Sequence, residues 1–187
     1  MATINERRER ERAQRHQLIV TAARELAEEQ GWDAVTTRRL AERVEYSQPV
    51  LYSHFDGKSA IMGAVALDGF ADLARRLGRA RRAAPRTALR SVCRAYLDYA
   101  TERPAMYQAM FVLPTDLRFA HADTPAPMRA AFDAFVACFG EDNPRREALA
   151  EIVWSALHGL VVLADSGRIP PAGQRERVDL LVSRFTD

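Results

Sequence analysis

The sequence predicts an all-α protein, because three features of its pattern agree. Apolar residues recur every three or four positions along almost the whole chain, as they do on one face of an α-helix. Strand-like alternation of apolar and polar residues is never sustained. Prolines and glycines fall between the periodic runs, where helices end. We therefore expect an N-terminal three-helix unit over residues 1–58 and a helical bundle over residues 59–187.

The first predicted helix ends at Gly31, which suits a left-handed cap. Its apolar face consists of Leu18, Ile19, Ala22, Ala23, Leu26 and Ala27. Trp32 and Val35 are expected to connect this helix to the next one. Upstream, residues 5–15 hold five arginines and three glutamates, with Glu6/Arg10 and Glu11/Arg15 at i,i+4 spacing. This arm either extends the helix, or follows DNA phosphates or enters the minor groove, and the pattern leaves these alternatives open.

Two short helices are expected next. Residues 37–44 form the first, with Thr36 or Thr37 as its cap and apolar residues turned inward. A break follows at Glu45. The second helix starts from Ser47 as a cap and runs to Phe55, since proline at position 49 is tolerated in a first turn.

Six further helices are predicted beyond this point, separated by proline-containing turns. Their expected ranges are 59–82, 86–102, 104–112, 125–139, 144–165 and 172–185. Residues 113–124 are expected to form a loop.

A long helix followed by two short helices, joined by three or four residues, is the layout of a helix-turn-helix. At about 100° per residue, Leu51 and Phe55 fall together and must face the core. The opposite face carries glutamine, proline, valine and serine, which suit base edges, and tyrosine, histidine and lysine can reach phosphates. The predicted DNA-contacting residues are Thr36, Thr37, Arg38, Gln48, Pro49, Val50, Tyr52, Ser53, His54 and Lys58.

A close resemblance to the DNA-binding signature of the tetracycline-repressor (TetR) family runs from Thr37 to Lys58, with a distinctive Leu-Tyr-x-His-Phe-x-x-Lys core. The resemblance implies a three-helix DNA-binding domain on an α-helical ligand-binding and dimerisation domain. It implies that Gln48, Pro49, Val50 and Ser53 face bases, and that Thr37, Tyr52, His54 and Lys58 contact the backbone. Members commonly have glycine where this chain has Glu45, so we expect the turn to differ locally, because a left-handed non-glycine residue costs about 1–2 kcal/mol.

The C-terminal half is rich in aromatic and flexible apolar side chains that suit an apolar effector site. These candidate ligand-binding residues are Phe70, Tyr96, Tyr99, Met106, Met110, Phe111, Phe132, Phe135, Trp154 and His158. Ordinary core packing is the alternative for each of them. The segment Trp154–Leu160, followed by Asp165-Ser166-Gly167-Arg168, resembles a TetR C-terminal subclass named for its Trp-His-Gly motif.

Apolar faces on the last two predicted helices suit a dimer bundle with two helices from each subunit. The candidate interface residues are Leu149, Ile152, Val153, Ala156, Leu160, Leu163, Val178, Leu181, Val182 and Phe185. We therefore expect a homodimer on palindromic double-stranded DNA, acting as a repressor that a small apolar effector releases. The alternative is a helical ligand-binding or protein-interaction module without specific DNA binding.

Composition excludes several other classes. The net charge is +2, and residues 1–58 hold ten basic and ten acidic residues, so net charge does not support DNA binding. No run approaches the ~20 apolar residues of a membrane span, so we expect a cytoplasmic protein without membrane contact. Ser155, His158 and Asp165 would share one helix and make no triad. We expect no enzyme, cofactor or metal, and we interpret Cys93 and Cys138 as small buried hydrophobes.

Overall fold

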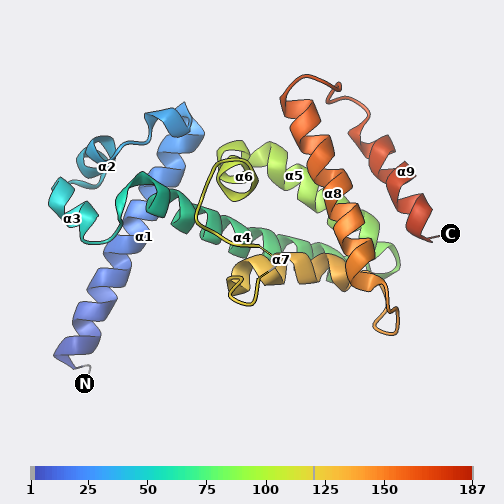
Figure 1. Ribbon diagram of the computed structural model, residues 1–187, viewed down its shortest axis with the longest axis horizontal. Coiled ribbons are helices and arrows are strands. Elements are labelled where there is room, and N and C mark those ends of the chain that lie inside the picture. The colour runs from blue at the N-terminus through green and yellow to red at the C-terminus, as the bar shows by residue number, and fades with distance from the viewer. Residues whose placement is uncertain (1–2, 120, 187) are drawn as a thin grey trace. The chain divides into compact units, whose positions relative to one another are not determined.

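The computed structural model describes residues 3–119 and 121–186, and this part of the chain contains helices and no strand (Figure 1). The all-α prediction is confirmed. The α-helices are α1 (Ile4–Gln30), α2 (Thr37–Val44), α3 (Gln48–Tyr52), α4 (Gly57–Ala83), α5 (Ala88–Glu102), α6 (Pro104–Phe111), α7 (Ala126–Val136), α8 (Arg146–Asp165) and α9 (Gln174–Thr186). Two 3-10 turns, η1 (Trp32–Ala34) and η2 (Pro85–Thr87), connect neighbouring helices.

Most predicted helix boundaries agree with the structure within two residues, and two helices end three residues earlier than expected. Helix α3 ends at Tyr52 rather than Phe55, because the amide of His54 bonds to the carbonyl of Leu51, three residues back, and tightens the turn. Helix α7 ends at Val136 rather than residue 139, where the amide of Cys138 bonds to the carbonyl of Phe135. Gly31 ends α1 with φ 79° and ψ 165°, so it has a positive φ but not the expected left-handed helical cap.

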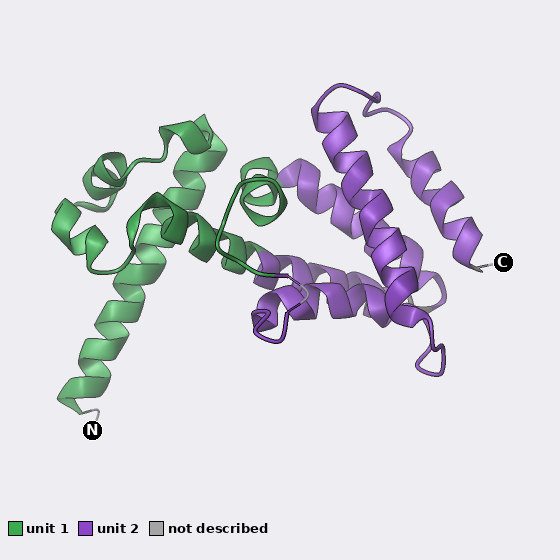
Figure 2. Cartoon of the chain, viewed as in Figure 1, with its two compact units in different colours: residues 1–69, 103–118 green, residues 70–102, 119–187 purple. Residues whose placement is uncertain are grey.

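The chain divides into two compact units (Figure 2). Unit 1 comprises residues 1–69 and 103–118, and unit 2 comprises residues 70–102 and 119–187. Helix α4 begins at Gly57, so residue 58 lies in the first turn of a helix that continues to Ala83. The boundary at residue 58 therefore stays a prediction about function.

Unit 1 is built on α1, which packs against η1, α2 and α6. Its core is apolar, with Ile19, Leu40 and Leu51 almost completely buried. The N-terminal arm is helical from Ile4, which Thr3 caps through a capping box with Glu6. The helical alternative for the arm is thus the one that the structure adopts.

Unit 2 packs α5 against α7, α8 and α9, with Tyr96 and Leu157 in its core. Cys93 is fully buried, Cys138 is half-buried, and neither forms a disulfide. Burial raises the pKa of the Cys93 thiol to about 12 and that of the Cys138 thiol to about 11. Both thiols are therefore protonated at neutral pH, in agreement with the interpretation as small hydrophobes.

Helix α8 comes closer to a membrane span than the sequence led us to expect. In the described part of the chain it alone is long and apolar enough to cross a membrane by length and composition, and most of that apolar stretch is not buried. One such helix is weak evidence for a membrane span.

Candidate nucleic-acid interface

Helix α2 is held in place by a cap at one end and an apolar face along its length. The Thr36 hydroxyl accepts a 3.2 Å hydrogen bond from the amide of Arg39, so Thr36 rather than Thr37 is the N-cap. Leu40, Ala41 and Val44 are buried, as expected. Thr37 is half-exposed and Arg38 is exposed, so the N-terminus of α2 is accessible to a phosphate.

The turn after α2 adopts left-handed geometry although it has no glycine. Glu45 has φ 57° and ψ 34° and is the one non-glycine residue with positive φ among residues 3–119 and 121–186. Its amide and that of Tyr46 both bond to the carbonyl of Ala41, which closes the helix end. The expectation that Glu45 would change the turn is therefore wrong: the chain keeps the geometry and accepts about 1–2 kcal/mol of strain.

Helix α3 presents the polar face that the sequence predicts. Leu51 and Phe55 are 1% and 5% exposed and anchor the helix in the core. Gln48, Pro49 and Ser53 are exposed, and Val50 is half-buried. The Ser53 hydroxyl donates a 2.7 Å bond to the carbonyl of Val50, which leaves its lone pairs free for a base donor. Ser47 occupies the N-cap position without a side-chain cap bond.

The residues expected to contact phosphates differ in their exposure and in the bonds that they already make within unit 1. Tyr52 is 56% exposed, and Arg38 forms a surface pair with Glu42 at 3.0 Å. Lys58 instead donates to the carbonyl of Trp32 and is half-buried. It also lines a shallow pocket of about 370 Å³ with Ser59, Met62, Pro114, Thr115 and Asp116. A phosphate contact from Lys58 therefore requires this internal bond to be given up.

His54 lies against α1 rather than fully outward. Its ring is 6.4 Å from that of His16, which stacks on Phe55 at 4.4 Å. Burial lowers the pKa of His54, and the positive charges of Arg12, His16 and Arg15 lower it further. At neutral pH the imidazole is thus uncharged, so it can offer a phosphate a hydrogen bond but not a full charge.

Salt bridges within unit 1 explain why its charge count is uninformative. Arg43 forms a bidentate pair with Glu29 at 2.9 and 2.7 Å and reaches Glu25 at 3.4 Å. The Arg43 hydrogen bond holds the pKa of Glu29 below its usual value, and Glu29 raises the pKa of Arg43. Arg7 pairs with Glu11 at 2.9 Å. These acidic residues neutralise structural arginines and do not lie on the exposed face of α3.

Glu28, which sequence reasoning missed, and Trp32, which was expected only to connect the first two helices, attach α6 to α1 and η1. The carboxylate of Glu28 accepts bonds from the amides of Ala105 and Met106 at 3.4 and 3.3 Å. The indole of Trp32 donates a 2.7 Å bond to the carbonyl of Ala105. A glutamate on the first helix gave no sequence signal for a partner more than seventy positions away. A proline opening α6, which leaves its first amides without helical partners, was the available hint.

The predicted ligand-binding residues divide between the two units. Met106, Met110 and Phe111 belong to unit 1, and the remainder to unit 2. In unit 2 the Trp154 indole donates a 3.2 Å bond to the Tyr96 hydroxyl, and Tyr96 meets Phe135 edge to face at 5.7 Å. Phe132 lies 6.0 Å from Trp154. Phe70, Tyr96, Tyr99, Met106, Met110 and Phe135 are buried, and Phe111, Phe132, Trp154 and His158 are half-buried.

The predicted dimer-interface residues have unequal access to solvent. Val153, Val178 and Val182 are buried inside unit 2, so they are unavailable to a second subunit in this conformation. Leu149, Ala156, Leu160, Leu181 and Phe185 are half-buried. Ile152 and Leu163 are 56% and 40% exposed. Val162 and Leu180, which the sequence did not single out, are also exposed.

Two family models match the chain. Residues 19–65 match the model described as bacterial regulatory proteins, tetR family. Residues 89–185 match the model described as tetracyclin repressor-like, C-terminal domain. The first match contains α2 and α3, and the second contains most of unit 2.

Curated relatives and solved structures agree with these models. A helix-turn-helix transcriptional regulator of Mycobacterium tuberculosis, itself uncharacterised, is 30% identical over 155 residues, which cover 80% of this chain and 69% of that protein. The class G tetracycline repressor of Vibrio anguillarum is 47% identical over 47 residues, 25% of this chain and 22% of the repressor. A Rhodococcus protein of unknown function superposes with a TM-score of 0.73 at 22% identity, covering 91% of this chain and 92% of that one. This last likeness shows a shared fold.

Proposed function

This chain belongs to the tetracycline-repressor (TetR) family of bacterial regulatory proteins, and we propose that it is a dimeric repressor released from a palindromic operator by a small apolar effector. The main support for the proposal is the exposed face of α3. Gln48, Tyr52 and Ser53 are exposed on this face, while Leu51 and Phe55 pack into the core on the opposite side. The family consists of transcriptional regulators, so we expect no catalysis and a cytoplasmic location, where DNA is accessible.

In this proposal α3 enters the major groove and reads bases. Gln48 pairs with adenine, Pro49 and Val50 pack on thymine methyl groups, and Ser53 bonds to a base edge. Thr36, Thr37, Arg38 and Tyr52 hold the phosphates on either side, and His54 and Lys58 add contacts once they leave their partners in unit 1. A two-fold dimer presents two such helices about 34–36 Å apart, which predicts a palindromic site.

The dimer in this proposal forms through α8 and α9. Ile152, Leu163 and Leu180 are exposed on these helices although they are large and apolar. Exposed apolar side chains on neighbouring helices suit a four-helix interface between identical subunits. We propose this smaller exposed set, with the half-buried residues of the predicted interface at its edge.

The effector is proposed to bind among the aromatic residues of unit 2. Tyr96, Phe132 and Trp154 offer ring faces together with polar atoms at the Tyr96 hydroxyl and the Trp154 indole, which suits an apolar ligand with few polar groups. Such a ligand releases DNA only if it binds the non-DNA-binding conformation more tightly. Membership of the Trp-His-Gly subclass remains part of the proposal and rests on the segment Trp154–Leu160.

The test is sequence selection from random DNA with the purified full-length protein, followed by mobility shifts on the recovered site. We expect one palindromic sequence, with binding that weakens as salt rises. Gln48→Ala should relax preference at one base pair in each half-site, whereas Tyr52→Ala should weaken binding to every sequence. Gln174→Ala, in α9, is the matched control. Recovery of no common sequence would favour a ligand-binding module without specific DNA binding.

A further inference from the structure

Arginines gather in unit 2 without acidic residues between them. From Leu73 to Leu97 the chain holds eight arginines and no aspartate or glutamate, although the whole chain carries a net charge of only +2. The segment covers the end of α4, the turn η2 and most of α5. Arginine provides every basic residue of the chain except Lys58, so the use of arginine instead of lysine is not specific to this segment. The distinctive features of the segment are the clustering of its arginines and its lack of acidic residues.

Residues outside the segment neutralise some of these arginines. Arg76 forms a bidentate pair with Glu102, with both distances 2.7 Å. Arg90 and Arg94 share Asp179 of α9 at 3.1 and 3.0 Å. These three side chains therefore have structural roles within unit 2.

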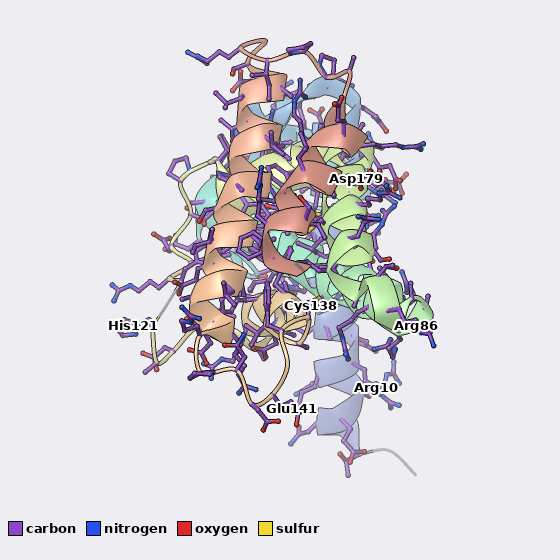
Figure 3. All side chains as sticks on the ribbon, turned by 90° about the vertical axis from the view of Figure 1, so that its right-hand side faces the viewer. Arg10, Arg86, His121, Cys138, Glu141 and Asp179 are labelled. Carbon is purple, nitrogen blue, oxygen red and sulfur yellow. The ribbon has the colours of Figure 1, made fainter. Side chains whose placement is uncertain are left out.

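The others leave positive charge on the surface. Arg75 has one exposed partner, Asp72, at 3.1 Å. Arg79, Arg82 and Arg86 are exposed, and in the described part of the chain no carboxylate lies within salt-bridge distance of them. Figure 3 shows Arg86 projecting from η2, just before α5, away from the helices around it.

These four exposed residues, Arg75, Arg79, Arg82 and Arg86, form what we call the arginine stripe. The first three are spaced i, i+4 and i+7 on α4, so they lie along one side of the helix, while Leu73 and Leu77 on another side are buried. At 1.5 Å per residue, Arg75 and Arg82 are about 10 Å apart along the axis. This length matches about three nucleotides of one strand at 3.4 Å each.

The surroundings of the stripe favour a phosphate polymer over other anionic partners. Between Arg75 and Arg86 the residues other than arginine are three alanines, a leucine, a glycine and a proline. None of the exposed large apolar residues of the described chain lies between residues 70 and 102. A protein partner usually needs buried aromatic or aliphatic anchors, and a helix on a membrane needs an apolar face. Binding to a nucleic-acid backbone needs only cations at the right spacing.

We propose that the arginine stripe binds the phosphodiester backbone of nucleic acid without reading its sequence, as a contact separate from the helix-turn-helix. Each guanidinium presents a planar fork of donors that fits two phosphate oxygens. Arginine stays charged throughout the physiological pH range, so this binding depends on salt and hardly on pH.

The experiment uses the full chain with Gln48→Ala and Tyr52→Ala already introduced, so that the helix-turn-helix contribution is weakened. In this background the triple variant Arg79→Gln/Arg82→Gln/Arg86→Gln is compared with Arg145→Gln/Arg168→Gln/Arg175→Gln. The second triple removes the same charge from other exposed positions of unit 2. Affinity for random-sequence duplex DNA is measured by fluorescence anisotropy between 50 and 200 mM salt, and circular dichroism verifies that both variants fold.

We expect the stripe variant to bind at least about tenfold more weakly at 50 mM salt, with a log–log salt slope reduced by about 2–3, because three phosphate contacts are lost. The control triple should keep the slope of its parent. Equal slopes in the two triples would overturn the proposal. Binding to vesicles with anionic lipid and to polyglutamate is measured in parallel. If the stripe variant binds one of these more weakly but binds DNA as its parent does, the proposal is overturned too. Failure to select an operator would refute the proposed repressor function and leave this comparison intact.

Discussion

The indole nitrogen of Trp32 donates a 2.7 Å hydrogen bond to the carbonyl oxygen of Ala105, which joins the turn after α1 to the first turn of α6. Glu28 accepts from the amides of Ala105 and Met106, so α6 is fixed to α1 through both donors and acceptors. In addition, Lys58 donates to the carbonyl of Trp32. Residues of α1, α4 and α6 are therefore linked around Trp32 and Ala105 within unit 1.

Replacing Trp32 by Phe tests how much this junction contributes. Trp32 is 6% exposed, so the substitution leaves the Ala105 carbonyl buried without its donor, which costs about 1–3 kcal/mol. We expect Trp32→Phe to lower the free energy of unfolding by that amount in urea denaturation and to weaken operator binding. Trp154→Phe, which removes an indole bond to Tyr96 in unit 2, is the control. Equal losses of operator affinity would argue against a special role for Trp32.

The strained turn at Glu45 provides a second prediction. Glu45→Gly removes the left-handed penalty of about 1–2 kcal/mol and adds back part of it through a more flexible unfolded chain. We expect a net gain of about 0.5–1 kcal/mol in the free energy of unfolding. Glu45→Gln keeps the strain and removes only the charge. If both variants gain stability equally, the cause is the carboxylate and not the backbone.

Close packing between α4 and α6 makes Gly69 a sensitive position. A Cβ at Gly69 would lie 2.6 Å from the Met110 sulfur and 2.7 Å from the Met106 sulfur. Gly69→Ala therefore forces both side chains to move, and we expect a loss of about 1–3 kcal/mol in thermal unfolding.

Gly63→Ala is the matched control for this change on the same helix. Among the described residues nothing lies within 4 Å of a Cβ at Gly63, so alanine there should stabilise α4 by about 0.5–1 kcal/mol. Met110→Ala and Gly69→Ala combined should cost less than the sum of the two single changes, because the shorter side chain no longer meets the added Cβ. Opposite signs at the two glycines are the expected result, and equal signs would contradict the packing argument.

His54 predicts how stability changes with pH. Burial, followed by the charges of Arg12, His16 and Arg15, lowers its pKa in the folded state. When pH falls below about 6.5, His54 is protonated in the unfolded chain but not yet in the folded chain. The stability present above that pH is therefore lost. His158, whose pKa is lowered by burial, acts in the same direction.

We therefore expect the wild type to lose free energy of unfolding between about pH 7.5 and 5.5, and His54→Gln to lose less. Urea denaturation at several pH values measures both slopes. His158→Gln should also flatten the curve, and the double variant should flatten it most. A His54→Gln curve parallel to that of the wild type would contradict the inferred burial of the imidazole.

The sequence predicted those parts of the fold and site that depend on local periodicity. The inward Leu51 and the outward Gln48 follow from helix geometry alone, and both were predicted correctly. His54 could not be placed in this way, because its surroundings include His16 and Arg12 from α1. Contacts between distant segments have no local signature, which is why Glu28 at α6 was missed.

The predicted dimer interface also shows that periodicity alone does not reveal which segment covers a residue. Periodicity identifies an apolar residue but cannot tell whether its own chain or a second one covers it. Val153 and Val182 are covered within unit 2, whereas Ile152 and Leu180 are not. Only the packing of α5 and α7 against α8 and α9 separates the two groups.

The exposed apolar residues of α8 carry the last prediction. Ile152, Val162 and Leu163 are 56%, 39% and 40% exposed, and a charge at an interface centre is strongly unfavourable. We expect Ile152→Arg/Leu163→Arg to sediment as a monomer in analytical ultracentrifugation and to lose operator affinity, because one recognition helix reads only half of a palindrome. Leu18→Arg, at an exposed leucine of α1, should remain dimeric.

The same variants separate dimerisation from membrane contact, which the length and composition of α8 also permit. In a dimer, Ile152 and Leu163 are buried against a second subunit, so the arginines change the oligomeric state. Neither the wild type nor the variant then sediments with vesicles. A helix held in a membrane would instead make the wild type sediment with vesicles, and the arginines would abolish that while the oligomeric state stayed the same. Because arginine within the hydrocarbon core costs about 2.5–3.5 kcal/mol, the second outcome would be unmistakable and would overturn the proposed interface.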